Sequence, residues 1–208
     1  MENNLINYNK FVSSTNIEGP GNRFAIWLQG CVINCFGCSN QEMIPLIKKT
    51  VRPVSELFKA IVDAKERFNI EGITVLGGEP LIQPKALEEL LFLCKSIGLT
   101  TIVFSGYLYE NIKEKYPKII ESLDILIDGP FMINKLDKSR RLVGSTNQRI
   151  WKLSDVYENN PYFEQSTIEG EFSIEDNVVS INGDGAHLYP ENNNLIKMWE
   201  EHKKNNKK

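Results

Sequence analysis

Apolar residues in most of the chain alternate between short runs and longer stripes with helical spacing. Short β-branched runs bounded by glycine or polar residues predict buried strands at 24–29, 73–76, 100–104 and 123–127. Between them, apolar residues at helical spacing predict a helix capped by Ser55, a helix that starts at Pro84, and a helix over 108–120. Repeated strand–helix–strand order predicts an α/β fold with a parallel sheet.

The pattern changes after Trp151. Residues 166–173 and 177–181 predict a β-hairpin around the acidic turn Glu175-Asp176, and a short helix is expected from about Asn193. With 208 residues, one domain is the natural expectation. We therefore expect a core over residues 1–151 and, over residues 152–208, an extension of the same domain with a flexible end.

Composition and charge narrow the classes of partner. The chain is 41% hydrophobic and 25% charged, with a formal net charge of -3, so no basic field exists to attract nucleic acid. The only basic cluster is the lysine-rich end, which is expected to be a frayed, solubilising tail. No apolar run approaches the roughly 20 residues that span a bilayer. With no pattern of an export signal, a cytoplasmic location is expected.

Cys31, Cys35 and Cys38 form a Cys-x3-Cys-x2-Cys pattern within one short segment. Three thiolates this close cannot complete a tetrahedral site made of protein alone, but they can hold three corners of an iron–sulfur cluster. The fourth iron then remains open to a ligand that is not protein. An open metal position is where chemistry takes place, by the reasoning that separates catalytic from structural zinc sites.

The alternatives for these cysteines are weaker. A zinc site usually pairs Cys-x2-Cys with a second pair or with a His pair, and neither His187 nor His202 has a neighbouring ligand pair. A disulfide would need an oxidising compartment. Cys94, the remaining cysteine, lies on the apolar stripe of its predicted helix, where a core position is favoured over a fourth cluster ligand.

A second motif follows about forty residues downstream, in the segment GITVLGGEP. Gly77, Gly78, Glu79 and Pro80 come directly after a predicted strand. Glycines let backbone approach a ligand closely, and a glutamate accepts hydrogen bonds from an ammonium group. By itself such a segment is only a turn with an exposed acid. Following the three cysteines, it indicates a cofactor site.

Together the two motifs resemble the radical S-adenosylmethionine (SAM) superfamily. The resemblance implies that the methionyl amino and carboxylate groups of SAM chelate the open iron, while the GGEP turn holds the amino group. It also implies a partial (β/α) barrel, here with a small C-terminal hairpin and helix extension.

Further motifs resemble glycyl-radical-enzyme activases, in particular the activating proteins of anaerobic ribonucleotide reductase. The matching segments run from Ser14 to Trp151 and are IEGPGNRFAIWLQGC, the Cys38-Ser39-Asn40 end of the cysteine segment, IDGPF and GSTNQRIW. Glu18 stands where an aspartate is usual. Asp128-Gly129-Pro130 stands where the larger activases have Asp-x-Lys.

Active sites collect at the carboxyl ends of parallel strands, which nominates further ligand-binding residues. Ser105 is expected either to bind the carboxylate or ribose of SAM or only to form a turn. Asp128 is expected to bind a ribose hydroxyl, and Gly37 stands where many radical SAM enzymes place an aromatic residue. The predicted SAM-binding residues are Gly37, Ser39, Gly77, Gly78, Glu79, Pro80, Ser105 and Asp128.

The resemblance implies an oxidoreductase of an anaerobic cell. A flavodoxin- or ferredoxin-like donor would reduce the 4Fe–4S cluster, and SAM would be cleaved to methionine and a 5′-deoxyadenosyl radical that abstracts a hydrogen atom. The expected donor of that hydrogen is a glycine of a large partner such as anaerobic ribonucleotide reductase. Its contact surface is expected around Tyr107, Phe131 and residues 144–149, where Arg149 either grips the partner or pairs with Glu18.

Two other functions remain open from the sequence. A freestanding radical SAM enzyme that modifies a peptide or small molecule would explain the segment after Trp151. A plain iron–sulfur electron carrier would have no use for the GGEP turn, which argues against it.

Overall fold

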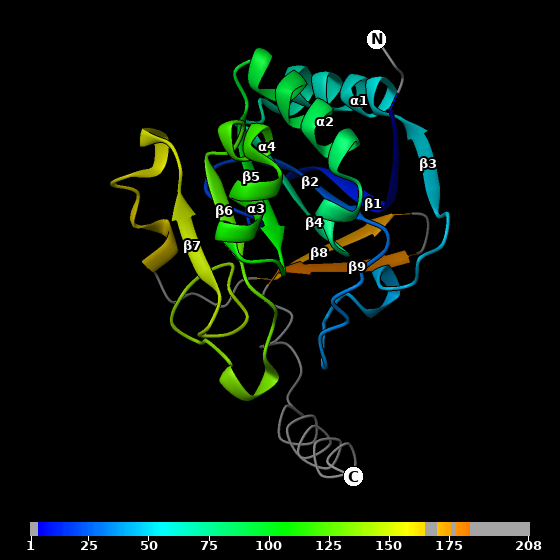
Figure 1. Cartoon of the computed structure of the whole chain (residues 1–208). Helices are drawn as coiled ribbons and strands as arrows, with labels where there is room; N and C mark the ends of the chain where they lie inside the picture. Colours follow the sequence, from blue (N-terminus) through cyan, green and yellow to red (C-terminus); the bar gives the residue numbers. More distant parts are fainter. Residues whose placement is uncertain (1–3, 165–169, 176–177, 184–208) are drawn as a thin grey trace.

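A computed structural model describes residues 4–164, 170–175 and 178–183. Its main feature is a seven-stranded sheet with the strand order β3-β1-β2-β4-β5-β6-β7 (Figure 1). The four central strands are parallel: β2 (Arg23–Leu28), β4 (Gly72–Gly77), β5 (Thr100–Ser105) and β6 (Ile125–Asp128). These are the strands that the apolar runs predict, so the parallel α/β core is confirmed.

Both edges of the sheet are antiparallel, which the sequence did not predict. On one side β1 (Leu5–Thr15) pairs with β2, and β3 (Thr50–Pro53) pairs with β1. On the other side β7 (Arg149–Lys152) pairs with β6. These three strands are partly exposed and carry polar residues, so they lack the continuous apolar runs of strands that are buried on both faces.

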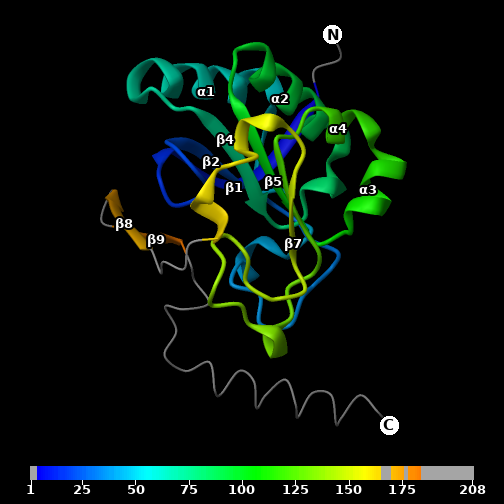
Figure 2. The same ribbon diagram turned by 90° about the vertical axis from the view of Figure 1, so that its left-hand side faces the viewer.

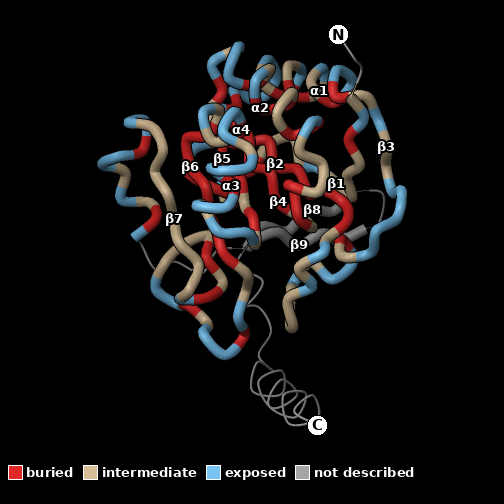
Figure 3. The backbone as a smooth tube through the Cα atoms, viewed as in Figure 1, coloured by how far each residue is buried: buried red, intermediate tan, exposed pale blue. Residues whose placement is uncertain are grey.

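The helices pack on one face of the sheet. They are α1 (Val54–Phe68), α2 (Pro84–Ser96), α3 (Tyr109–Lys115) and α4 (Pro117–Glu121), and Figure 1 shows α2, α3 and α4 in front of the strands. Alternate residues of the central strands, such as Ile26, Val75 and Leu126, join the buried residues of these helices in one core. The burial of the central strands is visible in Figure 3.

Short 3-10 turns and loops cover the other face. Trp27 and Leu76 pack there with Met43, while Ile125 and Ile127 pack with Tyr157 and Phe163. The 3-10 turns are η1 (Gln41–Met43), η2 (Pro80–Ile82), η3 (Ile133–Lys135), η4 (Asp155–Tyr157) and η5 (Pro161–Glu164). The helices thus form a single layer, and the closure of the sheet into a partial barrel stays a prediction.

Two details of the predicted helices are wrong. Ser55 does not cap α1, because the helix already begins at Val54 with Pro53 as its N-cap residue. The helix predicted over 108–120 is two helices that meet at Tyr116 and Pro117. Proline has no backbone N–H and its ring clashes with the preceding turn, so one continuous helix cannot pass through this position.

After η5 the structure describes the strands β8 (Gly170–Glu175) and β9 (Val178–Gly183), which pair as a separate antiparallel hairpin. Figure 2 shows this hairpin on the side of the molecule away from α3 and α4. The predicted helix from Asn193, His187 and His202 all lie outside the described residues. Strand β7 crosses residue 151, and the division of the chain at that point stays a prediction. Among the described helices, none is both long enough and apolar enough to cross a membrane.

Arg23 holds together the amino ends of the parallel strands. Its guanidinium is fully buried and donates only to neutral oxygens: Pro20 O, Ile73 O, Thr74 Oγ1, Thr100 O, Thr100 Oγ1 and Tyr157 OH, at 2.6–3.2 Å. The EGPGNR segment therefore ends at the start of β2, whereas Cys31 follows the end of β2. A strand of this length spans roughly 17–20 Å. This motif consequently stabilises the far end of the sheet and does not touch the cysteines.

Replacing Arg23 should therefore destabilise the protein strongly. Arg23→Lys leaves several buried carbonyl and hydroxyl oxygens without a donor, and we expect a loss of about 3 kcal/mol or more in the free energy of unfolding. Urea denaturation followed by circular dichroism measures this loss. Arg52→Ala is the control, because Arg52 and Glu56 are exposed partners at 3.8 Å and should contribute less than about 1 kcal/mol. Equal effects of the two substitutions would contradict the structural importance of Arg23.

Candidate active site

The cysteines lie on a loop of residues 31–40, here called the cluster loop, that follows β2. Backbone hydrogen bonds close its base: Gly30 N donates to Met43 O at 2.8 Å and Cys31 N donates to Ile44 O at 3.0 Å. Gly30 has φ +100°, a conformation that favours glycine. The loop lies at the same end of the sheet as the segment between β6 and β7 (Figure 1). The structure thus places the cysteines at the carboxyl edge of the parallel strands, as predicted.

The cluster-loop cysteines are free thiols of intermediate exposure, while Cys94 is completely buried in α2. Burial raises the pKa of the Cys35 and Cys38 thiols, and the nearby thiol of Cys31 raises both further. Thiolates are the form that binds metal, so metal binding would displace protons from these thiols. Burial raises the pKa of Cys94 to about 12, which suits a core position and not a ligand.

Three cysteine thiols on one short loop are a donor set that fits an iron–sulfur cluster, because three of its irons can each take one thiolate. Among the described residues, no group of three or more His, Cys, Asp or Glu side chains is placed to hold one metal ion. A tetrahedral zinc with bonds of about 2.3 Å would need sulfur atoms only roughly 3.8 Å apart. A cluster binds each thiolate through a different iron, so it requires three sulfurs that are more widely spaced.

The GGEP turn is clamped to the start of the cluster loop by its backbone. Gly78 N donates to Leu28 O and Glu79 N donates to Gly30 O, both at 2.8 Å. A Cβ on Gly78 would lie 2.1 Å from Gly30 O and 2.8 Å from Met43 O. Glycine is therefore required at position 78 because the GGEP turn packs directly against the backbone of Gly30 and Met43. This requirement comes from contacts within the protein and not from a ligand. Pro80 is the buried first residue of η2.

Glu79 is almost completely buried and is well supplied with donors. Its Oε1 accepts from Leu81 N and from Ser105 Oγ, both at 2.9 Å, and its Oε2 accepts from Gly106 N at 2.8 Å. Burial raises the pKa of Glu79, and these three hydrogen bonds oppose that shift. Ser105 also accepts from Tyr107 N at 3.1 Å. Glu79, predicted from the GGEP motif, and Ser105, nominated by its place at a strand end, thus meet in one buried cluster.

Asp128 is also buried and engaged with protein partners. Arg149 donates Nε to Asp128 Oδ1 at 2.9 Å and a second N–H to Oδ2, and Tyr109 N donates to Oδ2 as well. The same guanidinium pairs with the exposed carboxylate of Glu110 at 2.8–2.9 Å. Hydrogen bonds to Asp128 and Glu110 raise the pKa of Arg149. Arg149 therefore pairs with these two acids and not with Glu18.

The loop of residues 144–149 ties itself to the end of β6. Gln148 accepts from Gly144 N and Ser145 N through Oε1 and donates to Gly129 O. Asn147 donates to Pro130 O at 2.7 Å, while its buried Oδ1 has no hydrogen-bond partner in the described part of the chain. An unpaired buried acceptor is costly, so Asn147 is a further residue that a ligand could engage.

The cluster loop rests on its neighbours at three points. Gly37 has φ +75°, and a Cβ there would meet Ile133 Cδ1 at 2.6 Å. Ile33 lies against Gly106, and a Cβ added at Gly106 would be 2.3 Å from Ile33 Cδ1. Asn40 donates to Gly77 O at 3.3 Å, while Ser39 is exposed. Sequence reasoning missed Ile33 and Asn40 as contacts of the site, although Asn40 already belonged to a recognised motif.

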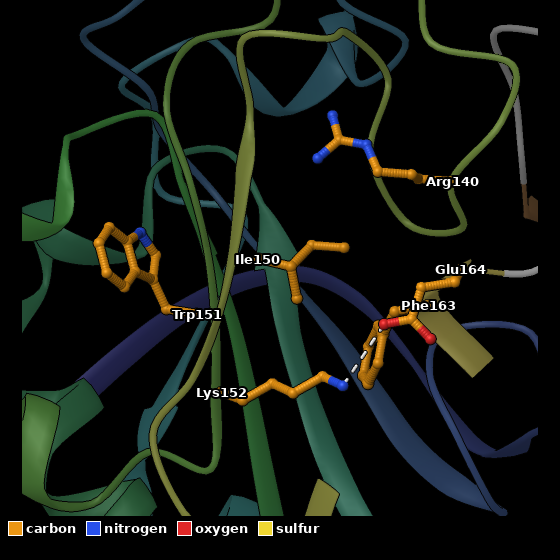
Figure 4. A pocket seen from close by; sticks show the side chains of 6 residues that line it. All are labelled: Arg140, Ile150, Trp151, Lys152, Phe163 and Glu164. Carbon is orange, nitrogen blue, oxygen red and sulfur yellow. Dashed lines mark ion pairs between the residues drawn. The ribbon is translucent and has the colours of Figure 1, made fainter. Parts of the chain in front are cut away.

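A pocket of about 330 Å³ lies along β7, and none of the predicted SAM-binding or cluster residues lines it. Figure 4 shows Ile150 and Lys152 on its side of the strand, with Trp151 pointing the other way and Lys152 paired with Glu164. Trp151 instead stacks on Tyr109, with ring centroids 4.3 Å apart. The predicted chemistry belongs to the carboxyl edge, and this pocket is not part of it.

The cluster loop and the adjoining glycine-rich turn meet at the carboxyl edge of the parallel strands, which is the arrangement that the resemblance to radical SAM enzymes implies. Residues 17–151 match the family described as "4Fe-4S single cluster domain", and the chain belongs to this family. A 4Fe–4S cluster is therefore its metal cofactor.

Several activating enzymes are similar to the chain. The pyruvate formate-lyase-activating enzyme of Listeria monocytogenes is 36% identical over 115 residues, covering 54% of the chain but only 45% of that enzyme. The anaerobic ribonucleoside-triphosphate reductase-activating protein of Vibrio cholerae is 26% identical, over 72% of the chain and 99% of that protein. Among solved structures, Escherichia coli QueE is 18% identical, with a TM-score of 0.41 over 49% of the chain and 53% of QueE.

The ligand assignment predicts a clear difference among the cysteines. After anaerobic reconstitution the protein should hold about four irons and four sulfides per chain. Cys31→Ala, Cys35→Ala and Cys38→Ala should each lose the cluster, whereas Cys94→Ala should retain it. Iron and sulfide analysis with the visible absorption spectrum measures both. Tight stoichiometric zinc without iron, or cluster loss only in Cys94→Ala, would contradict the assignment.

Substitution of Gly78 should disturb the cluster before any ligand binds. Gly78→Ala places a methyl group against Gly30 O, so the base of the cluster loop must move and the yield of reconstituted cluster should fall. Gly98→Ala is the control, because a Cβ at Gly98 meets nothing within 4 Å and tests only the cost of φ +78°. An unchanged cluster yield in Gly78→Ala would show that the turn is not held by this close contact.

Proposed function

We propose that the protein activates a glycyl radical enzyme, an anaerobic ribonucleotide reductase, by reductive cleavage of SAM. The cluster loop clamped to the GGEP turn is the observation that carries the SAM chemistry. The choice of partner is supported by length. Activating proteins of anaerobic ribonucleoside-triphosphate reductase from Vibrio cholerae and phage T4 match this chain over 99% and 96% of their own length.

The residues of the chain hold and orient the reacting groups. Cys31, Cys35 and Cys38 would hold the cluster through three of its irons, and the carboxyl edge would supply the surface for SAM. When bound, the cluster supplies the electron that cleaves SAM to methionine and a 5′-deoxyadenosyl radical. The residues proposed to form the SAM site, by touching the ligand or by supporting those that do, are Gly37, Ser39, Gly77, Gly78, Glu79, Pro80, Ser105 and Asp128.

Exposed apolar side chains around the carboxyl edge support a protein partner. They come from the cluster loop, the segment before β3, and the turns after β5 and β6: Val32, Leu46, Ile47, Tyr107, Leu108 and Met132. Gathered apolar residues on a surface mark sites of protein interaction. We propose that the glycyl loop of the partner enters here, and that a flavodoxin- or ferredoxin-like donor reduces the cluster in the cytoplasm.

A second candidate function is a freestanding enzyme that modifies a peptide or small molecule. The observation in its favour is the length of chain beyond the matched family region, which ends at residue 151 and is followed by the hairpin of β8 and β9. The identity of the hydrogen donor separates the two candidates.

The partner is tested by following the hydrogen atom. Reduced protein with SAM and the large subunit of an anaerobic ribonucleotide reductase should produce a doublet electron paramagnetic resonance signal on that subunit. Deuterium placed on the glycine of the partner should then appear in 5′-deoxyadenosine. Deuterium transfer only from a free peptide or metabolite, with no radical on a large subunit, would support the second candidate instead.

Surface variants test the docking face in the same assay. Leu46→Asp places a charge on a side chain that is 69% exposed beside the cluster loop, and it should slow activation of the partner by about tenfold or more. Cleavage of SAM without the partner should change little. Phe92→Asp, at a side chain 66% exposed on α2, is the matched control and should change neither rate. Equal slowing by both variants would argue against this face.

A further inference from the structure

The buried carboxylate of Glu79 accepts hydrogen bonds from three protein donors. Its exposure is only 1%, and its three donors come from the start of η2 and from the turn that follows β5. A carboxylate has about four acceptor positions, so at most one remains on Oε2. Glu79 therefore links, through its protein contacts alone, two turns at the ends of neighbouring parallel strands.

This linkage reaches the cluster loop at two points. The backbone N–H of Glu79 donates to Gly30 O at the start of that loop. Its carboxylate holds Gly106 N, and Gly106 in turn lies against Ile33 in the middle of the loop. The first point depends only on backbone, whereas the second depends on the side chain of Glu79.

Ser105 completes the same arrangement. Its hydroxyl donates to Glu79 Oε1 and accepts from Tyr107 N, so the direction of the hydroxyl is set by these two partners. One buried carboxylate thereby fixes the turn of residues 105–107. Hydrogen bonds to a charged carboxylate are shorter and stronger than hydrogen bonds to a neutral acceptor.

We propose that Glu79 is a positioning residue, which fixes the 105–107 turn beneath Ile33 of the cluster loop, and that it does not pair with the ammonium group of the bound ligand. This proposal rests on the proposed function, in which the bound ligand is SAM. It makes the acid of the GGEP turn a determinant of the shape of the site, present before SAM binds.

The first test uses the reconstituted protein without SAM. Glu79→Gln keeps the shape of the side chain but replaces one acceptor oxygen by an N–H2 group, which must oppose a protein donor. The amide N–H of Gly106 should then exchange with solvent at least about tenfold faster, a change in the free energy of local opening of about 1.4 kcal/mol. The visible circular dichroism of the cluster should also change. Glu114→Gln, which removes an exposed acid on α3, should leave both signals as in the wild type.

The second test separates positioning from contact with the ammonium. S-adenosylhomocysteine and its derivative with the amino group replaced by hydrogen are titrated anaerobically into the wild type and Glu79→Gln. Positioning predicts that Glu79→Gln weakens both ligands by the same factor, within about twofold. A loss confined to the amino-bearing ligand, with unchanged exchange at Gly106, would overturn the proposal.

Ser105→Ala tests the same proposal if the Glu79→Gln variant does not fold. It removes one donor to Glu79 and leaves the charge in place, so positioning predicts faster exchange at Gly106 and equal weakening of both ligands. Unchanged exchange in Ser105→Ala would count against the proposal. Failure of the wild type to bind S-adenosylhomocysteine would instead overturn the proposed function, while the exchange measurement still decides whether Glu79 holds the turn.

Discussion

The carboxyl edge of this protein depends on the contact between Gly78 and Gly30. The pairing of β2 with β4 continues beyond both strands, as Gly78 N donates to Leu28 O and Glu79 N donates to Gly30 O. No side chain fits at Gly78, where a Cβ would lie 2.1 Å from Gly30 O. The loop that carries three cysteines is therefore anchored at its base by backbone hydrogen bonds to a neighbouring strand.

Two polar clusters of opposite kind hold the two ends of the parallel strands. At the amino ends a buried cation, Arg23, donates to neutral oxygens from β4, β5 and η4. At the carboxyl ends buried anions, Glu79 and Asp128, accept from backbone N–H groups and from Ser105 and Arg149. Each buried charge is compensated by several hydrogen bonds, which is the condition for burying it at acceptable cost. The sheet can then present a rigid edge to a cofactor.

The motifs that identify the family are divided between these two ends. The cysteines and the GGEP turn lie at the carboxyl edge, whereas the EGPGNR segment closes the amino edge through Arg23. The 144–149 segment braces the end of β6 through Gln148 and Arg149. A motif that accompanies a reaction need not touch the reacting atoms, because the position of a strand end depends on both ends of the strand.

The amino-acid sequence by itself determined the ligand chemistry of the loop, the parallel α/β core and the buried position of Cys94. These follow from local spacing, since the apolar periodicity and the interval between thiols are properties of neighbouring residues. Only the tertiary structure decided the antiparallel edges and the partners of Glu79, Asp128 and Arg149. Their partners are distant in the sequence, at Ser105 and Gly106 for Glu79 and at Arg149 for Asp128. The sequence does not show whether a carboxylate contacts a ligand or a buried N–H group. Its partner depends on which distant residues the folded sheet brings next to it.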